Sequence, residues 1–139
     1  MKKIQIDDCI CHSKIKEHLE IRDSILSEIE KSSDGNLEQK DSFYTDSISK
    51  LDWDISDKLD RPWVKIFLPV FIKNLKEVID NLGYAKVVIQ NIWYQQYLEG
   101  DTHGWHIHDD HFTGVYYIEF PEGCSQTEII SPYDFKAVK

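Results

Sequence analysis

The clearest pattern in the chain is a stripe of apolar residues over positions 64–82. Its members recur every three or four positions, which is the spacing that places side chains on one face of an α-helix. We predict a helix here, with the stripe buried against a sheet. Pro62 is a start signal and Gly83 a stop signal, whereas Pro69 predicts an early end or a kink. The stripe consists of Val64, Phe67, Leu68, Phe71, Ile72, Leu75, Val78, Ile79 and Leu82.

A second amphipathic pattern covers residues 13–31, where apolar residues stand among charged ones at helical spacing. We predict a shorter helix for this range. Residues 32–49 are rich in Ser, Asp, Asn and Gly and have no sustained period, which is typical of a loop.

After Gly83 the local composition changes to β-branched and aromatic residues, a mixture that favours strands. We predict strands over residues 84–98, 113–120 and 127–130, with an alternating segment over 105–110. The plan is a single α+β domain over 1–139. A helical part, 1–83, precedes an antiparallel part, 84–139, and packs on one side of it.

Composition narrows the class of protein. A chain of 139 residues that is 41% hydrophobic and 12% aromatic supports one globular domain. Its net charge of −9 disfavours binding to nucleic acid. No apolar run reaches the roughly 20 residues of a membrane span, and no secretory signal precedes the first helix, so we expect a cytoplasmic protein without a membrane partner. We interpret the three cysteines, Cys9, Cys11 and Cys124, as reduced thiols.

Four of the six histidines lie between His103 and His111. If this segment is extended, its side chains alternate in direction, so His106, His108 and Asp110 share one face. Imidazole and carboxylate groups are ligands for divalent iron, zinc or manganese. These three residues are therefore the candidate metal ligands. The alternative is a solvated polar strand end that binds nothing.

The segment 106–111 also fits the H-x-H-x-D-H pattern of the metallo-β-lactamase fold. In that fold the motif leads into a helix, whereas here the following residues, 115–118, read Val-Tyr-Tyr-Ile and predict a strand. A dinuclear hydrolase therefore stays a minor alternative.

Three motifs in order support another interpretation. Residues 97–100 read Tyr-Leu-Glu-Gly, residues 106–108 read His-Ile-His six positions after the glycine, and residues 114–118 read Gly-Val-Tyr-Tyr-Ile. Over residues 89–130 the chain resembles the 2-oxoglutarate- and Fe(II)-dependent oxygenases, specifically the prolyl-hydroxylase-like group and its phage and marine bacterial relatives. The resemblance implies an antiparallel double-stranded β-helix, a jelly-roll of cupin type. It also implies a hydroxylase-type dioxygenase with Fe(II) as cofactor and 2-oxoglutarate as small-molecule cosubstrate.

By this resemblance His106 is the first metal ligand and His108 stands where the family usually has a carboxylate. Tyr97 and Tyr117 match tyrosines that contact 2-oxoglutarate. Either the site is rich in histidine, or the ligand pair shifts to His108 and Asp110. The neighbouring turn residues Glu99, Asp101 and His103 could approach the mouth of the cleft, but residues of this kind are usually just solvated. Trp93 and Trp105 are expected to be packing residues.

The family places a second histidine on a strand well beyond residues 114–118, with a basic residue after it. Here no histidine follows His111, and the only basic residues after Tyr117 are Lys136 and Lys139, close to the end of the sequence. We therefore expect the sequence to be the N-terminal portion of a longer reading frame, with the barrel incomplete at its C-terminus. As written, the chain is predicted to bind iron weakly and not to turn over 2-oxoglutarate. The alternative is a non-catalytic, metal-binding remnant of the same fold.

Overall fold

The computed structural model describes residues 10–32, 47–108, 111–130 and 137–138. The chain forms two compact units. The larger unit spans Ile15–Gly114, and the smaller unit is drawn from Met1–Lys14 and Val115–Lys139.

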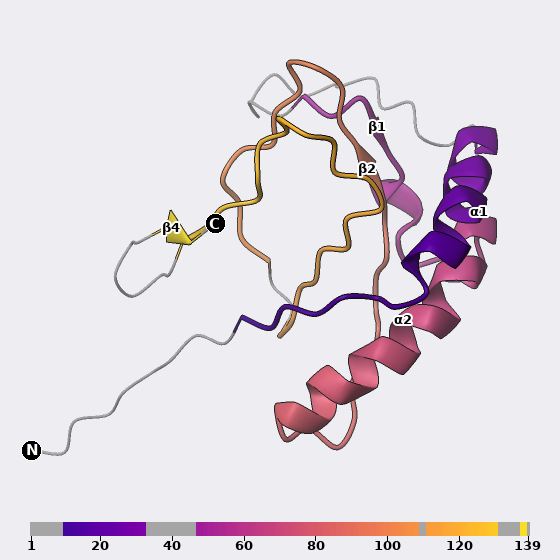
Figure 1. Ribbon diagram of the computed structural model, residues 1–139, viewed down its shortest axis with the longest axis vertical. Helices are drawn as coiled ribbons and strands as arrows, with labels where there is room; N and C mark the ends of the chain where they lie inside the picture. Colours follow the sequence, from indigo (N-terminus) through magenta and orange to yellow (C-terminus); the bar gives the residue numbers. More distant parts are fainter. Residues whose placement is uncertain (1–9, 33–46, 109–110, 131–136, 139) are drawn as a thin grey trace, which may run out of the picture. The chain divides into compact units, whose positions relative to one another are not determined.

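Two helices dominate the larger unit, α1 over His18–Lys31 and α2 over Pro62–Asn81 (Figure 1). Both were predicted from apolar periodicity, and both are confirmed. Pro62 occupies the start of α2, and Gly83 follows its end with a φ of 77°, a left-handed conformation that glycine adopts without steric cost. The helix continues through Pro69, which therefore does not end it.

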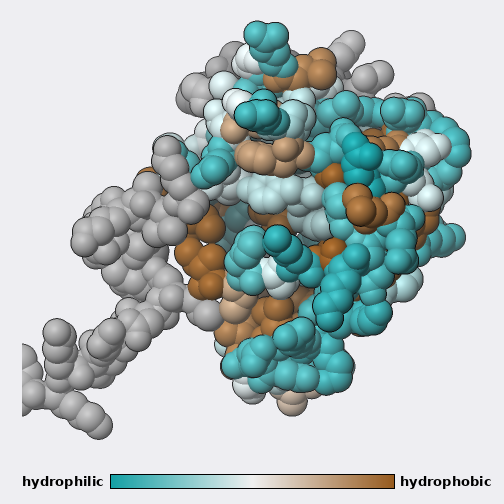
Figure 2. Space-filling view, in the orientation of Figure 1, coloured by the Kyte–Doolittle hydropathy of each residue, from teal (hydrophilic) through white to brown (hydrophobic). Residues whose placement is uncertain are grey.

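The core of the larger unit lies between the two helices and residue 94. Val64 and Phe67 of α2 are buried, but most of the rest of the predicted stripe is only half-buried. The stripe packs on α1, and no labelled strand within the described residues packs on α2, so the expectation that a sheet covers it is wrong. Hydrophilic residues cover much of the helix side that faces the viewer in Figure 2. The buried apolar residues are Ile25, Ile29, Trp63, Val64, Phe67 and Tyr94.

The strands are few and short. In the larger unit, β1 (Lys50–Leu51) pairs antiparallel with β2 (Gln95–Gln96), and a 3₁₀ turn, η1, follows over Trp53–Ile55. In the smaller unit, β3 (Ile129–Ile130) pairs with β4 (Ala137–Val138). The expected double-stranded β-helix is therefore wrong for the residues that the structure describes, which contain two separate two-stranded sheets.

The physical reason lies in where the β-forming side chains are. Val88, Ile107 and Val115 are all exposed, Ile107 to 89%. Strand preference in β-branched and aromatic residues comes mainly from packing against neighbouring strands and a buried face. Without such a face, the predicted strands 84–98 and 113–120 are reduced to β2 alone.

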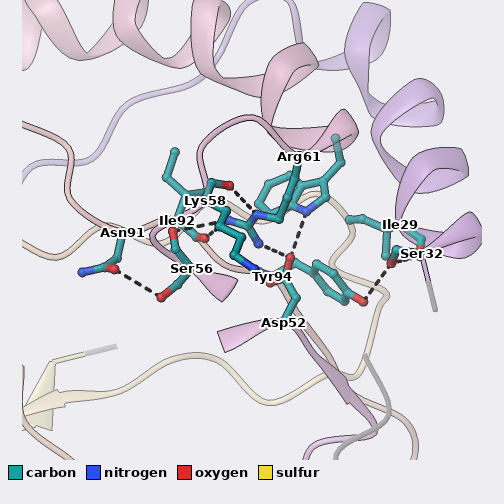
Figure 3. Close-up of polar contacts among 10 residues, drawn as sticks. Ile29, Ser32, Asp52, Ser56, Lys58, Arg61, Asn91, Ile92 and Tyr94 are labelled. Carbon is teal, nitrogen blue, oxygen red and sulfur yellow. Dashed lines mark hydrogen bonds and ion pairs between the residues drawn. The ribbon is translucent and has the colours of Figure 1, made fainter. Parts of the chain in front are cut away.

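A buried polar cluster, which we call the Asp52 cluster, joins the parts of the larger unit (Figure 3). It consists of Asp52, Arg61, Trp63 and Tyr94. One carboxylate oxygen of Asp52 accepts hydrogen bonds from the Trp63 indole at 3.0 Å and from the Arg61 guanidinium, and the other accepts one from the Tyr94 backbone N–H at 2.8 Å. Asp52 is 3% exposed and Arg61 8%. Two buried charges thus neutralise each other, which lowers the desolvation cost of each.

The remaining donors of Arg61 point at backbone carbonyls. Its Nε donates to the Lys58 carbonyl at 2.8 Å, and its Nη2 donates to the Ile92 carbonyl. The Ile92 N–H in turn donates to the Ser56 carbonyl at 3.0 Å. The Asp52 cluster therefore fixes residues 92–94 against η1 and the start of α2, immediately before β2.

The smaller unit contains the predicted turn over residues 121–123. The Cys124 N–H donates to the Pro121 carbonyl at 3.2 Å, and Gly123 has a φ of 88°. Tyr117 belongs to this unit, where its hydroxyl donates to Thr127 and its ring meets Phe120 edge-on at 5.1 Å. Across the described residues of the chain, no helix has both the length and the apolar character needed to cross a membrane.

Candidate functional site

The candidate site belongs to the larger unit and begins with the turn that follows β2. The Asp101 N–H donates to the Leu98 carbonyl at 3.1 Å, and Gly100 adopts a φ of 88°. This confirms the predicted turn at Gly100 and Asp101. The turn reverses the chain, so that residues 103–108 return past residues 93–97.

The Asp101 side chain holds this turn against the segment that leads into β1. Its carboxylate accepts hydrogen bonds from the Leu98 N–H at 2.8 Å, the Ser49 N–H at 3.0 Å and the Ser47 hydroxyl at 2.9 Å. These bonds, with that from the Leu98 N–H first, lower the pKa of Asp101. The sequence-based expectation of a merely solvated residue is therefore wrong for Asp101.

Two of the predicted metal ligands lie together. The Nε2 atoms of His106 and His108 are 3.1 Å apart, and both side chains are exposed. The Nδ1 of His106 lies 3.0 Å from the Gly104 carbonyl oxygen. Because a carbonyl only accepts hydrogen bonds, Nδ1 carries the proton and Nε2 is the acceptor nitrogen of the ring, with Nε2 of His108 beside it. His106 is thus held in the tautomer that a metal ligand at Nε2 requires.

The other side of His106 is occupied by His103. The two imidazole rings are stacked, with centroids 4.2 Å apart and planes 14° apart. The hydroxyl of Tyr97 donates to the Gln95 side chain at 2.8 Å, and Nδ1 of His103 lies 3.0 Å from the same hydroxyl oxygen. We call the exposed surface formed by Tyr97, His103, His106 and His108 the histidine face.

The separation of the two nitrogens can be compared with that of ligands on one metal ion. With metal–nitrogen bonds of about 2.0–2.1 Å, two imidazoles at a right angle are about 2.9 Å apart, and two at the tetrahedral angle are about 3.4 Å apart. The observed 3.1 Å lies between these values. This separation is that of an N–H···N hydrogen bond between the two rings, and it also lies in the range of two neighbouring nitrogen ligands on one divalent ion.

The remaining predicted site residues are placed as follows. Asp110, the third candidate ligand, lies outside the described residues. Tyr97 is on the histidine face, whereas Tyr117 belongs to the smaller unit, where its hydroxyl binds Thr127. Within the described residues, no group of three or more His, Cys, Asp or Glu side chains is placed to hold a metal ion.

Sequence reasoning missed two residues of this region. His103 is exposed, as expected, but the stacking of its ring on His106 was not predicted. Trp93 was expected only to pack, but its ring lies 6.2 Å from that of His108. A usable signal was present, since Trp93, Gln95 and Tyr97 alternate along the chain and therefore point to one side.

Comparisons with known proteins add nothing to this geometry. No protein-family model matches the chain, and no match was found among curated proteins or solved structures.

Proposed function

We propose that this chain carries the divalent metal centre of an Fe(II)- and 2-oxoglutarate-dependent oxygenase, with His106 and His108 as ligands. The observation that supports the proposal most is the 3.1 Å separation of their Nε2 atoms on an exposed face. Little movement is needed for both nitrogens to bind one ion. The choice of iron rests on the three-motif resemblance described above.

Asp110 is the proposed third ligand. It follows His108 by two positions, so in an extended segment it points to the same side. Two imidazoles and one carboxylate form the ligand set of non-haem Fe(II) oxygenases. When bound, Fe(II) supplies the activation of oxygen that accompanies decarboxylation of 2-oxoglutarate.

The chain's own residues would orient the ligands and the cosubstrate. The Gly104 carbonyl fixes the tautomer of His106, and the His103 ring restricts its rotation by stacking. We assign contact with 2-oxoglutarate to Tyr97, the tyrosine of the histidine face. Its hydroxyl forms hydrogen bonds with His103 and Gln95.

A thermal-unfolding experiment with Fe(II) and 2-oxoglutarate, performed without oxygen, tests the proposal. A ligand that binds only the folded chain stabilises it by about 2.7 kcal/mol when present at 100 times its Kd. We expect Fe(II) to raise the melting temperature by several degrees, and 2-oxoglutarate to raise it further only when Fe(II) is present. His106→Ala is the control and should abolish both effects.

Succinate release under oxygen then separates two functions. Release above the level of His106→Ala supports the oxygenase. Stabilisation by Fe(II) with no effect of 2-oxoglutarate contradicts the oxygenase and favours a non-catalytic metal-binding protein. Absence of succinate alone agrees with the predicted lack of turnover by this chain. Absence of any Fe(II) effect contradicts both.

A further inference from the structure

Two tryptophan rings form an aromatic corner beside the histidine face. The ring centroids of Trp53 and Trp93 are 4.4 Å apart, and their planes are nearly perpendicular, at 87°. The Trp93 ring also lies 6.2 Å from the ring of His108, one of the proposed metal ligands. Trp53 is 47% exposed, so this corner is open to solvent. Any group bound there would lie next to the proposed metal centre.

The chain covers other aromatic rings with its own cations. The Arg61 guanidinium lies 5.1 Å from the Trp63 ring centroid, and the Lys50 ammonium lies 5.9 Å from that of Tyr94. Among the described residues, neither Trp53 nor Trp93 has a lysine or arginine over its ring. The ring faces that this edge-to-face contact leaves exposed are thus available to a cation from outside the chain.

The charges around Trp53 favour a cation as well. Asp54 lies in η1, Asp57 and Asp60 lie between η1 and α2, and all three are exposed. None of the three forms an ion pair or hydrogen bond with a described residue, and the only exposed positive side chain among them is Lys58. The local field therefore attracts an ammonium group and repels a phosphate or a carboxylate, in the same sense as the net charge of −9.

We propose that the substrate of this centre presents an alkylammonium group and that the aromatic corner of Trp53 and Trp93 binds it. The inference rests on the proposed function for the reaction that follows, but the binding step needs no metal. An ammonium held against the corner would place the adjoining carbon atoms of the substrate beside His108.

Choline and its neutral carbon isostere, 3,3-dimethylbutan-1-ol, provide a matched pair of probes for the metal-free chain. The four indole N–H resonances report where each probe binds. We expect choline to shift the signals of Trp53 and Trp93 saturably and to leave those of Trp63 and Trp105 in place. The isostere should bind about fivefold more weakly, because it lacks the charge that the rings attract.

Two substitutions provide the controls. Trp53→Leu keeps apolar bulk but removes the aromatic ring, and it should weaken choline binding about fivefold with little loss of stability, since Trp53 is half exposed. Trp105→Leu changes a residue that is 64% exposed and alternates with the histidines, and it should leave choline binding unchanged. Equal binding of both probes, no saturable shift at Trp53 and Trp93, or an unaffected Trp53→Leu variant would overturn the inference.

The same samples distinguish this inference from the proposed function. The imidazole resonances of His106 and His108 report metal binding independently of the indole signals. If metal binds and choline does not, only this inference fails. If choline binds and metal does not, the proposed metal centre fails, and with it the role of the corner in a reaction.

Discussion

The Asp52 cluster and the histidine face involve neighbouring residues of the same short segment, 93–97. Polar groups are buried in the cluster and exposed on the face. Tyr94 points inward, where its N–H binds the buried Asp52 carboxylate. Trp93 and Tyr97 lie beside the exposed histidines. Within the described residues, no buried side-chain nitrogen or oxygen is without a hydrogen-bond partner, whereas the Nε2 atoms of His106 and His108 meet on an exposed surface.

This difference shows how one segment can both stabilise a fold and present ligands. A polar group in the interior must have its hydrogen bonds satisfied, because an unsatisfied one costs its full desolvation free energy. A solvated imidazole has no such requirement and can keep a lone pair for an ion. Substitutions in the Asp52 cluster should therefore change the free energy of unfolding, and those on the histidine face should change binding.

The largest expected effect is that of Asp52→Ala. It leaves the buried Arg61 guanidinium without its carboxylate and removes the acceptor for Trp63 and Tyr94. Removal of one partner from a buried ion pair costs about 3–5 kcal/mol. Urea unfolding should show this loss.

The same substitution by alanine on the histidine face is the control. His106→Ala removes an exposed side chain and should change the free energy of unfolding by about 0.5 kcal/mol or less. Similar losses for the two variants would contradict the division between a structural cluster and a binding face.

A smaller effect is expected at the turn that supports the histidine face. Gly100→Ala forces a side chain into a φ of 88°, although nothing lies within 4 Å of the added Cβ atom. The cost, about 1–2 kcal/mol, is therefore conformational. Gly114→Ala also meets open space but has no positive φ, and urea unfolding should show no destabilisation. A tolerated Gly100→Ala would show that the turn does not need this backbone conformation.

The smallest expected effect concerns the ion pair of Glu17 and Lys73, which is more exposed than the buried pair of Asp52 and Arg61. Glu17, just before α1, accepts hydrogen bonds from Lys73 and Asn74 of α2, and Lys73 first and Asn74 second lower its pKa from the usual 4.5 to about 2. A lowered carboxyl pKa stabilises the fold above pH 4.5, and this contribution is lost as the pH falls from 4.5 to about 2.

Melting temperatures of the parent chain and Glu17→Gln, measured from pH 6 to pH 2, check this. At pH 6 the parent should have a slightly higher melting temperature than Glu17→Gln, and this difference should disappear as the pH falls from 4.5 to about 2. A constant difference at every pH would show that the carboxylate is not what joins α1 to α2.

The two helices could be predicted from sequence because helical periodicity is a local property. The stripe of α2 and its terminal Pro62 and Gly83 are readable without knowing what packs on them. Strand pairing is not local, since it depends on which distant segments supply partners and a buried face. The β-branched residues after Gly83 therefore predicted far more sheet than forms.

The candidate site was predictable in part for the same reason. Alternation places His106 and His108 on one side, and their Nε2 atoms are in contact. The pairing of Asp52 with Arg61, and of Asp101 with the serines before β1, joins segments that no sequence period relates. The roles of Asp110 as a ligand and of Tyr117 as a cosubstrate contact stay predictions.

Calorimetric titration of the chain with Fe(II) in the absence of oxygen tests the central claim most directly. Three variants belong beside the parent: His106→Ala, His108→Ala and, as control, His111→Ala, which removes a nearby exposed histidine. We predict one bound ion per chain, affinity that falls about tenfold or more in each of the first two variants, and no change in the third. Equal affinity of the parent and the His106→Ala and His108→Ala variants would contradict it.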